Sequence, residues 1–385
     1  MVAIKKEKRS QPKLKYNVNF VFKVRVIILN KIYFIQLNIT IIYFLNLLEL
    51  LMIKTLQISE KKAWDLVFNA LVNNQTSEDN AKEVADALIS AEFDGQSGHG
   101  ISRVPSYVEQ LTSGKVNGKE APSLLDSEGS VIRIDANNGF AYPAISLALK
   151  EITITSKKFG IAAASISRSH HFGQAGRHVE ILAESGLIGL MFGNTPKAIP
   201  PWGGTKALFG TNPIAFSSPR DNEPPLVIDM SLSKVARGKV MVANQQNEKI
   251  PEHWAIDSEG KPTTDPKKAL EGAMLPIGDA KGSALALMVE ILAAGLTGSN
   301  FGFEASSFLN AEGHAPSVGQ FIIAIDPSFF SGEHFSERTE TIIESILEQP
   351  STRLPGNKRL EKRKLLDSSK TITISKELFE TISQL

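Results

Sequence analysis

The sequence predicts an α/β fold with a helical N-terminal unit. Apolar runs of strand length alternate with segments of helical periodicity between residues 131 and 230. Two amphipathic helices precede this alternation, within residues 59–91. The chain has 385 residues, enough to bury a large apolar core. Alternating strands and helices are typical of the α/β class.

Residues 1–51 differ in composition from the rest of the chain. They are rich in Ile, Lys, Asn, Phe and Tyr, without Gly or Asp. Residues 32–53 are nearly uncharged and long enough for a membrane anchor. The alternative is a translated AT-rich leader, because AT-rich codons specify these residues, with the enzyme starting at Met52. We expect residues 1–51 to be such a leader, outside the folded protein, and we do not expect a membrane as a partner. A secretory signal is not expected, because no small-residue cleavage site follows the apolar run.

The helical unit is expected to span residues 52–125 and to contain His99, whose chemistry is considered below. Ser59 can cap a helix that begins at Glu60, and Ser77 can cap a second one.

The α/β domain is expected to span residues 126–300. Between 194 and 224 the sequence reads as a loop rich in Pro and Gly. The predicted strands are 131–136, the run from Gly160, the run from Gly186 and 225–230, and the predicted helices are 143–158, 174–185, 231–246 and 281–297.

Residues 301–385 are expected to pack back on the core as a C-terminal segment. They contain a predicted strand at 320–326 and an amphipathic helix at 336–348.

The composition excludes several function classes. With 42 basic and 41 acidic residues, the chain has no global field that would attract nucleic acid. It contains no cysteine, which excludes disulfides, a thiolate nucleophile and Cys-ligated metals. A cytoplasmic enzyme acting on a small molecule fits this composition. There is also no G-x-G-x-x-G turn after a strand and no G-x-x-x-x-G-K-[ST] loop.

The segment "DGQSGHGISRVPSY" places His99 four residues before Arg103. If it is helical past His99, imidazole and guanidinium share one face. A histidine transfers protons near neutral pH, and an arginine binds a carboxylate bidentately, as reduction of a 2-oxo acid requires. A helix-start histidine beside a surface arginine explains this segment alone equally well.

The segment "SRSHHFGQAGRH" contains three histidines. No carboxylate or cysteine nearby completes a metal site, so no metal is expected. His170 and His178 are expected to be packed in the protein, whereas His171, at a strand-to-helix turn, is placed to line a cleft.

Three further segments could bind ligands. Asn212 lies in a rigid "GTNP" turn, and Asp229 ends a buried strand, where it caps a helix or faces a ligand. Lys281 opens an apolar helix, where a cation opposes the helix dipole, which favours a nearby cofactor phosphate. "RLPGNKR", residues 353–359, is a basic turn that closes on the cofactor or is a solvated loop.

In this order and spacing the segments resemble the malate/L-lactate dehydrogenase type 2 family, from about Ile58 to the C-terminus. The blocks that carry the resemblance are "HGISRVPSY", "SHHFG", "PWGG" with "FGTNPIAF", "VIDMS", "DAKG" and "RLPG". The resemblance implies a non-Rossmann NAD(P)-binding α/β fold and a homodimer with the active site near the interface.

The resemblance also implies residue roles. His99 takes the place of the proton donor, Arg103 that of a partner of the substrate carboxylate, and Asp229 that of a residue orienting the imidazole. His171 and Asn212 would border the substrate pocket. The residues in the positions of cofactor contacts are Leu226, Val227, Ile228, Asp229, Met230, Ser231, Ala280, Lys281, Gly356, Asn357 and Lys358.

Two departures from the family pattern affect specificity. Gly98 stands where the family usually has Ser, so we expect Ser97 to supply the hydroxyl. Asn357 stands where the family usually has Glu, which removes a carboxylate that would bind the NAD ribose, while Lys358 and Arg359 are nearby. This favours NADP over NAD.

The resemblance thus implies a 2-hydroxy acid dehydrogenase that interconverts a small 2-oxo acid, of the malate, lactate or sulfolactate type, and its 2-hydroxy acid by hydride transfer. Gly98 widens the space beside His99, which keeps open a second reading as an NADPH-dependent reductase of piperideine- or pyrroline-2-carboxylate. A catalytically silent cofactor-binding relative and an enzyme anchored through residues 32–53 are the remaining alternatives.

Overall fold

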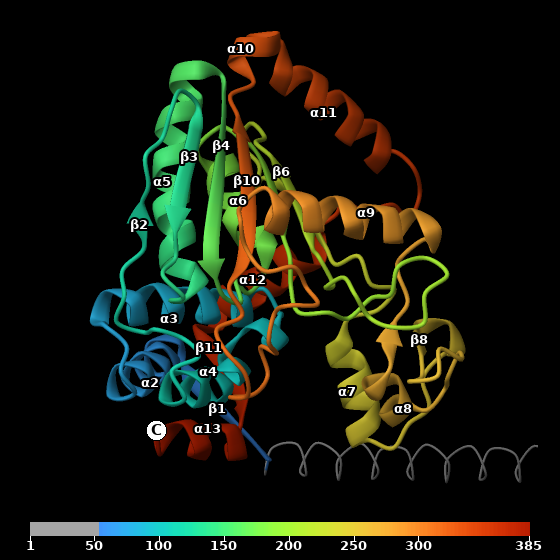
Figure 1. The fold of residues 1–385 in the computed structure, drawn as a ribbon. Coiled ribbons are helices and arrows are strands. Elements are labelled where there is room, and N and C mark those ends of the chain that lie inside the picture. Colours follow the sequence, from blue (N-terminus) through green and yellow to red (C-terminus); the bar gives the residue numbers. More distant parts are fainter. Residues whose placement is uncertain (1–53) are drawn as a thin grey trace, which may run out of the picture. The chain divides into compact units, whose positions relative to one another are not determined.

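A seven-stranded sheet with the strand order β2-β3-β4-β10-β5-β6-β7 forms the centre of the fold (Figure 1). The computed structural model describes residues 54–385. The leader predicted for residues 1–51 and the anchor considered for residues 32–53 lie outside the described residues. Residues 57–385 form one compact unit. None of the helices between residues 54 and 385 has the length and apolarity needed to cross a membrane.

The strands lie at β1 (Thr55–Ser59), β2 (Ser123–Leu124), β3 (Val131–Asp135), β4 (Ile161–Ser169), β5 (Ile188–Gly193), β6 (Ile214–Ser218), β7 (Leu226–Met230), β8 (Ala255–Ile256), β9 (Ala273–Met274), β10 (Val318–Ile325) and β11 (Thr371–Ser375). Of the neighbouring pairs in the central sheet, only β3 and β4 run parallel. β10 runs antiparallel to both of its neighbours, with Ala324 opposite Ala162 of β4 and Gly189 of β5.

The helices lie at α2 (Glu60–Asn73), α3 (Glu78–Phe93), α4 (Val104–Thr112), α5 (Ala141–Phe159), α6 (Ala175–Glu184), α7 (Arg237–Gln245), α8 (Pro266–Glu271), α9 (Ala280–Glu290), α10 (Ser328–Ser331), α11 (His334–Leu347), α12 (Asn357–Ser369) and α13 (Lys376–Ser383). Both predicted caps are confirmed, since Ser59 accepts a hydrogen bond from the Lys62 amide and Ser77 from the Asn80 amide.

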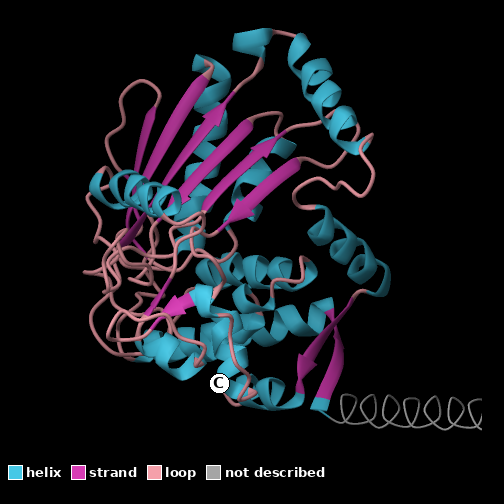
Figure 2. Ribbon diagram, turned by 90° about the vertical axis from the view of Figure 1, so that its right-hand side faces the viewer, coloured by secondary structure: helices cyan, strands magenta, loops and turns pink. Residues whose placement is uncertain are grey.

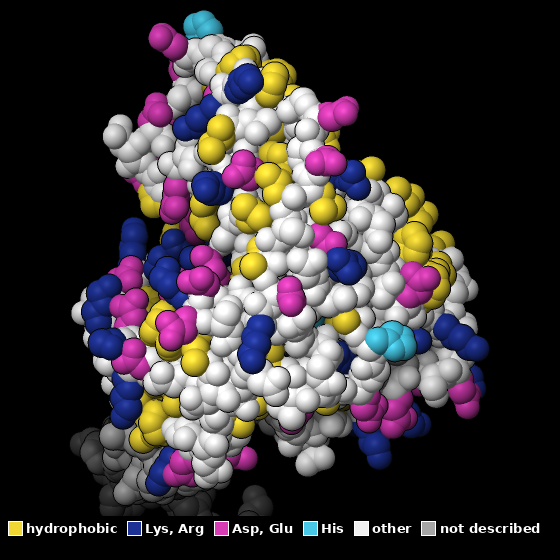
Figure 3. Space-filling model, turned by 60° about the vertical axis from the view of Figure 1, so that its left-hand side comes forward, with side chains coloured by type: hydrophobic (Ala, Val, Ile, Leu, Met, Phe, Trp, Pro, Cys, Tyr) yellow, Lys and Arg dark blue, Asp and Glu magenta, His cyan; other side chains and the backbone are white. Residues whose placement is uncertain are grey.

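Helices cover both faces of the sheet (Figure 2). On one face α5 and α6 pack on the strands through a core that includes Ile145, Val179 and Ile322. On the other face, residues of α9 such as Ala286 and Val289 pack with Ile199 and Phe209 of the loop after β5. A π-helical turn (Ile291–Gly295) continues α9 toward β10. The face of the molecule in Figure 3 carries charged side chains of both signs, in keeping with the near-zero net charge.

Three predicted elements are wrong in part. The loop expected at 194–224 contains β6, which pairs with β5 and β7. The helix expected from Ser231 begins only at Arg237, because Ser233 forms a bridge to Pro276 instead. The basic turn after Arg353 is followed at once by α12, and β11 and α13 also went unpredicted.

Candidate functional site

A pocket of about 580 Å³ lies where three distant parts of the chain meet. Residues 94–96, directly after α3, form one side, and 227–229 of β7 form another. The third side is built by residues between Arg353 and Lys362, around the start of α12. Because β7 is the last strand of the sheet, its outer edge is open to this pocket.

Gly356 allows α12 to begin against the edge of β7. It has a positive φ of 82°, a conformation that favours glycine. A Cβ at this position would lie 2.9 Å from the carbonyl oxygen of Val227. Both the backbone conformation and the close approach therefore require glycine. Of the predicted cofactor contacts, Val227, Ile228, Asp229, Gly356 and Lys358 all line this pocket, and Asn357 is the first residue of α12.

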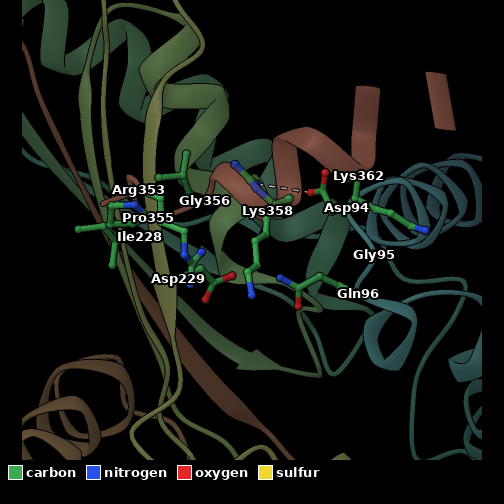
Figure 4. Close-up of a pocket in the computed structure, with 12 residues that line it drawn as sticks. Asp94, Gly95, Gln96, Ile228, Asp229, Arg353, Pro355, Gly356, Lys358 and Lys362 are labelled. Atoms are coloured by element: carbon green, nitrogen blue, oxygen red, sulfur yellow. Dashed lines mark hydrogen bonds and ion pairs between the residues drawn. The ribbon is translucent and has the colours of Figure 1, made fainter. Parts of the chain in front are cut away.

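Four cationic residues line the pocket, and three of them, Arg353, Lys358 and Lys362, are considered first. Figure 4 shows the side chain of Lys358 extending toward Asp229 and Gln96. Within residues 54–385 none of the three cations forms an ion pair or a side-chain hydrogen bond. They are available for an anionic ligand, and phosphate groups are the usual partners of such a cluster.

Arg359, expected near a cofactor phosphate, is engaged elsewhere. Its guanidinium pairs with Asp94 at 3.4 Å and with Glu180 at 2.9 Å, and Arg363 pairs with the same two carboxylates. These four residues are called the ion quartet below. The Asp94 and Glu180 side chains are 0% and 6% exposed, so Arg359 is committed to neutralising buried charge.

The remaining predicted cofactor contacts lie beside the pocket lining rather than in it. Leu226 and Met230 are the ends of β7, and Ser231 follows it. Ala280 and Lys281 open α9 and are exposed. The two regions are joined, since the Ile277 amide donates to the Leu232 carbonyl at 2.8 Å and Lys234 pairs with Asp279 at 3.2 Å.

His99 and Arg103 lie on two short 3-10 turns, Ser97–His99 and Ile101–Arg103, and not on one helix as the spacing suggested. Gly100 separates the turns, and a Cβ there would lie 2.1 Å from Glu92 Oε1, which accepts a hydrogen bond from the Ile101 amide at 2.8 Å. Glycine is therefore needed where this segment crosses α3. The segment continues directly from Gln96 of the pocket.

The guanidinium of Arg103 is held at one nitrogen and free at two. Its Nε donates to the Gly98 carbonyl at 2.6 Å, a bond that bridges both turns. Its two terminal nitrogens have no hydrogen-bond partner among the described residues. This fork can bind a carboxylate bidentately.

The imidazole of His99 has one occupied and one unoccupied nitrogen. Nδ1 lies 3.3 Å from His171 Nε2, while Nε2 has no partner within the described part of the chain. Burial, and secondly the charge of Arg103, lower the pKa of His99 to about 4. The imidazole is therefore neutral at pH 7 in the ligand-free protein.

Asp229 does not share a hydrogen bond with His99. Its Oδ2 accepts from the Gly176 amide at 2.7 Å, which ties β7 to the first turn of α6. The surrounding protein raises the pKa of Asp229, although the carboxylate is reached from the pocket. The geometry gives Asp229 a place in the pocket wall instead of a place behind the imidazole.

The residues predicted to bind substrate differ in their placement. Ser97 is exposed beside Gly98 and His99. Asn212 is fully buried, where its amide donates to the Ala286 carbonyl at 3.0 Å and to Glu290 at 2.9 Å, so it holds the loop to α9 and cannot reach substrate. His171 is buried and both of its ring nitrogens have protein partners.

Sequence reasoning missed two tyrosines and several pocket residues, Lys362 among them. Tyr107 and Tyr142 lie behind His171, and Asp94 and Gln96 line the pocket. Tyr107 stands four residues after Arg103 in the same motif, a spacing that could have drawn attention to it. Nothing in the sequence marks Tyr142, which comes from the start of α5.

Comparisons with known proteins agree over most of the chain. A family model described as malate/L-lactate dehydrogenase matches residues 58–383. A protein of Chromohalobacter salexigens named (2R)-3-sulfolactate dehydrogenase (NADP(+)) is 53% identical over 279 residues, which are 72% of this chain and 83% of that protein. A Delta(1)-pyrroline-2-carboxylate/Delta(1)-piperideine-2-carboxylate reductase of Pseudomonas putida is 40% identical over 78% of this chain and 89% of its own length.

A solved structure has a similar fold. The crystal structure of delta1-piperideine-2-carboxylate reductase from Pseudomonas syringae pvar. tomato superposes with a TM-score of 0.81 and 38% identity, covering 86% of this chain and 99% of that chain.

Proposed function

The chain belongs to the malate/L-lactate dehydrogenase family, and on that premise we propose that it reduces a small 2-oxo acid with NADPH through His99 and Arg103. It is an NAD(P)-dependent oxidoreductase that interconverts such an acid and its 2-hydroxy acid. Within this class we propose 3-sulfopyruvate and 3-sulfolactate as the substrate pair. The named activity of the 53% identical relative supports this choice.

One observation carries the assignment of the catalytic pair. Among residues 54–385, the two terminal guanidinium nitrogens of Arg103 have no partner, and neither does Nε2 of His99 on the neighbouring turn. A 2-oxo acid has a carboxylate one bond away from its carbonyl group. The first group suits the guanidinium fork, and the second needs a proton on its oxygen as it is reduced.

The residues of the pocket fit a nicotinamide dinucleotide. Gly356 lets the start of α12 lie against β7 beside the pocket. Arg353, Lys358 and Lys362, which are unpaired among the described residues, supply positive charge for the phosphates. We assign the 2′-phosphate of NADP to these cations. When bound, the nicotinamide supplies or takes up the hydride.

In this mechanism, Arg103 fixes the substrate carboxylate and so orients the 2-carbon. The carboxylate offsets the positive charge that lowers the pKa of His99, and it adds negative charge beside the imidazole. His99 therefore gains a proton as substrate binds, and its Nε2 delivers a proton to the oxygen of the reduced 2-carbon. Ser97 lies close enough along the chain to contact the same substrate.

Reduction of a cyclic imino acid is the second candidate. A Cβ at Gly98 would meet no heavy atom within 4 Å, so there is room beside His99 for a ring. The 40% identical relative, named as a reductase of such imines, supports the same reading.

The test is oxidation of NADPH and NADH by the protein with 3-sulfopyruvate, oxaloacetate, pyruvate and Δ1-piperideine-2-carboxylate. We expect NADPH oxidation to be fastest with 3-sulfopyruvate. His99→Gln should lower kcat by about 10²- to 10⁴-fold while NADPH still binds. Near-normal turnover of that variant would contradict the role of His99, and bound NADPH that no substrate oxidises would favour a catalytically silent relative.

We further propose that the enzyme is a homodimer and that α9 lies in the interface. Five large apolar side chains of α9 and the turn after it are more than a third exposed: Leu285, Leu287, Met288, Ile291 and Leu296. A contiguous apolar surface of this kind is typical of a protein interface. Leu287→Glu should shift the molar mass in light scattering from that of two chains to that of one, whereas Ile154→Glu, on a still more exposed residue of α5, should not.

The finer architecture is also a proposal. A non-Rossmann mode of cofactor binding is supported by the sheet, in which only β3 and β4 are parallel, whereas Rossmann sheets are mostly parallel. The division into 52–125, 126–300 and 301–385 and a cytoplasmic location stay predictions.

A further inference from the structure

A row of hydrogen-bonded side chains runs into the protein behind His99. His171 Nε2 lies 3.3 Å from His99 Nδ1, and the other ring nitrogen of His171 lies 2.6 Å from the hydroxyl of Tyr107. That hydroxyl lies 3.1 Å from the hydroxyl of Tyr142. All three residues behind His99 are buried. His171 follows the end of β4, Tyr107 lies on α4, and Tyr142 lies on α5.

All members of the row are uncharged at neutral pH. Burial, and then the charge of Arg103, lower the pKa of His171 well below its usual value. Burial raises the pKa of Tyr107 to about 12 and that of Tyr142 well above its usual value. Each phenol thus has one hydrogen to donate, and each imidazole has one.

Counting these hydrogens shows which group donates and which accepts in each hydrogen bond of the row. Among the described residues, the Tyr142 hydroxyl has no partner other than Tyr107, so it must donate to Tyr107 if its hydrogen is to be paired. Tyr107 then donates to His171 Nδ1, and His171 carries its own hydrogen on Nε2 and donates it to His99 Nδ1. In the opposite direction, a buried hydroxyl hydrogen is left unpaired, which costs about 1–3 kcal/mol.

We infer that Tyr107, acting through His171, is a positioning residue that holds neutral His99 in the tautomer with its hydrogen on Nε2. This inference rests on the proposed role of His99 in the reduction. Among the described residues Nε2 has no protein partner, so in neutral His99 the side of the ring that meets substrate carries the hydrogen. When His99 gains its second proton on substrate binding, Nδ1 also carries a hydrogen, and His171 must then accept it at Nε2. The free enzyme is therefore prepared to donate to the carbonyl oxygen of a 2-oxo acid.

Neighbouring aromatic rings keep the row in place. The rings of His99 and His171 lie nearly parallel, with an interplanar angle of 12° and centroids 5.4 Å apart. Phe308 packs against the edge of His171 at 5.4 Å, and Phe140 packs on Tyr107 at 5.3 Å. These contacts restrict ring rotation, so the hydrogen bonds are set by the tautomers.

The test is nitrogen NMR of the full-length protein labelled with 15N-histidine at pH 7, with His99→Gln used to assign the signal. We expect His99 to show a protonated Nε2 and a bare Nδ1. In Tyr107→Phe, His171 has no hydroxyl partner, either tautomer leaves one ring nitrogen unpaired, and we expect a mixture of both forms of His99. Tyr142→Phe is the matched control, because it removes an equally buried hydroxyl but leaves Tyr107 only His171 as an acceptor, so the tautomer should persist.

Kinetics give a second readout. In Tyr107→Phe, kcat/KM for the 2-oxo acid should fall several-fold while the KM for NADPH stays unchanged. The inference is overturned if wild-type His99 carries its hydrogen on Nδ1, or if Tyr107→Phe keeps the pure Nε2 form. The wild-type spectrum decides the matter even if Tyr107→Phe does not fold. Lack of turnover with every substrate would remove the proposed function and leave the NMR result standing.

Discussion

Gly98, the residue directly before His99, has space beside it that the sequence alone could not reveal. Since a Cβ there would meet nothing within 4 Å, Gly98→Ser should change the free energy of unfolding by no more than about 0.5 kcal/mol. The added hydroxyl narrows the space beside the imidazole. We expect kcat/KM for Δ1-piperideine-2-carboxylate to fall relative to kcat/KM for 3-sulfopyruvate. Gly238→Ser, at a second glycine with open space, should leave this ratio unchanged, and an unchanged ratio in Gly98→Ser itself would contradict the prediction.

The charge of Arg103 acts directly on the protonation of His99. A positive neighbour disfavours the imidazolium, so removing that charge in Arg103→Gln should raise the pKa of His99 above about 4. Burial remains and is the larger cause, so the pKa should stay below 6.5. NMR titration of His99 measures this shift. Arg177→Gln is the control, because it should raise the pKa of His178, and a His99 pKa unmoved by Arg103→Gln would refute the coupling.

At the scale of elements, the ion quartet holds α12 against the end of α3 and against α6, because its two arginines lie on α12 and its two carboxylates on the other two elements. Glu180→Gln would leave Arg359 and Arg363 with Asp94 as their single buried carboxylate. We expect the free energy of unfolding to fall by about 3–5 kcal/mol, as when a buried ion pair is broken. Because Gly356 and Lys358 lie at the same helix start, the KM for NADPH should rise as well.

Urea unfolding and cofactor titration measure these two effects. Asp65→Asn breaks the exposed pair with Lys61 and should cost less than about 1 kcal/mol, without an effect on KM. Equal losses of stability in the two variants would show that the quartet has no special role.

Local chemistry explains which elements could be predicted. The caps at Ser59 and Ser77 and most helices and strands of the α/β region depend on neighbours in sequence, and the structure contains them close to the expected bounds. The start of α12 depends on Gly356 packing against β7, more than a hundred residues earlier, so the segment reads as a turn when taken alone. The insertion of β10 between β4 and β5 is likewise a long-range pairing that no local pattern reveals.

At the scale of the whole molecule, four buried histidines are uncharged at neutral pH, and they make the folded state less stable at acid pH. Burial lowers the pKa of His99 and His178 to about 4 and of His170 to about 3, and it lowers that of His171 well below its usual value. The unfolded chain takes up protons at these residues below pH 6.5, whereas the folded chain does not. Their contribution to stability is therefore complete above pH 6.5 and is lost as the pH falls toward 4, by about 1.4 kcal/mol per pH unit for each histidine.

Urea midpoints at pH 7 and pH 5 measure this loss. The raised pKa values of Glu92, Glu184 and Asp229 act in the opposite direction and offset part of it. His178→Gln should reduce the difference in stability between pH 7 and pH 5, because it removes one titrating group. This holds whatever the effect of the substitution on stability at pH 7. Equal stability of the wild type at the two pH values would contradict the prediction.

The sequence proposes residues for the site, and their roles stay predictions, but it could not reveal how those residues are arranged. Motif order was enough to single out His99, Arg103, Asp229 and Gly356, and the structure brings the last two into one pocket. The partners of His99 could not be foreseen, because Tyr142 and His171 become neighbours of Tyr107 only once α4, α5 and β4 have packed. Asn212 was misjudged for the same reason, since its burial under α9 is a property of the assembled core.

The position of β7 at the end of the sheet has a consequence for the protein when cofactor is scarce. An outermost strand presents backbone groups that can template pairing with another chain, and proteins commonly cover or interrupt such strands. Here Gly356, at the start of α12, lies against Val227 of this strand. Val227, Ile228 and Asp229 also line the pocket, so a dinucleotide bound at the proposed site would lie beside the same strand, and we expect it to reduce pairing with another chain.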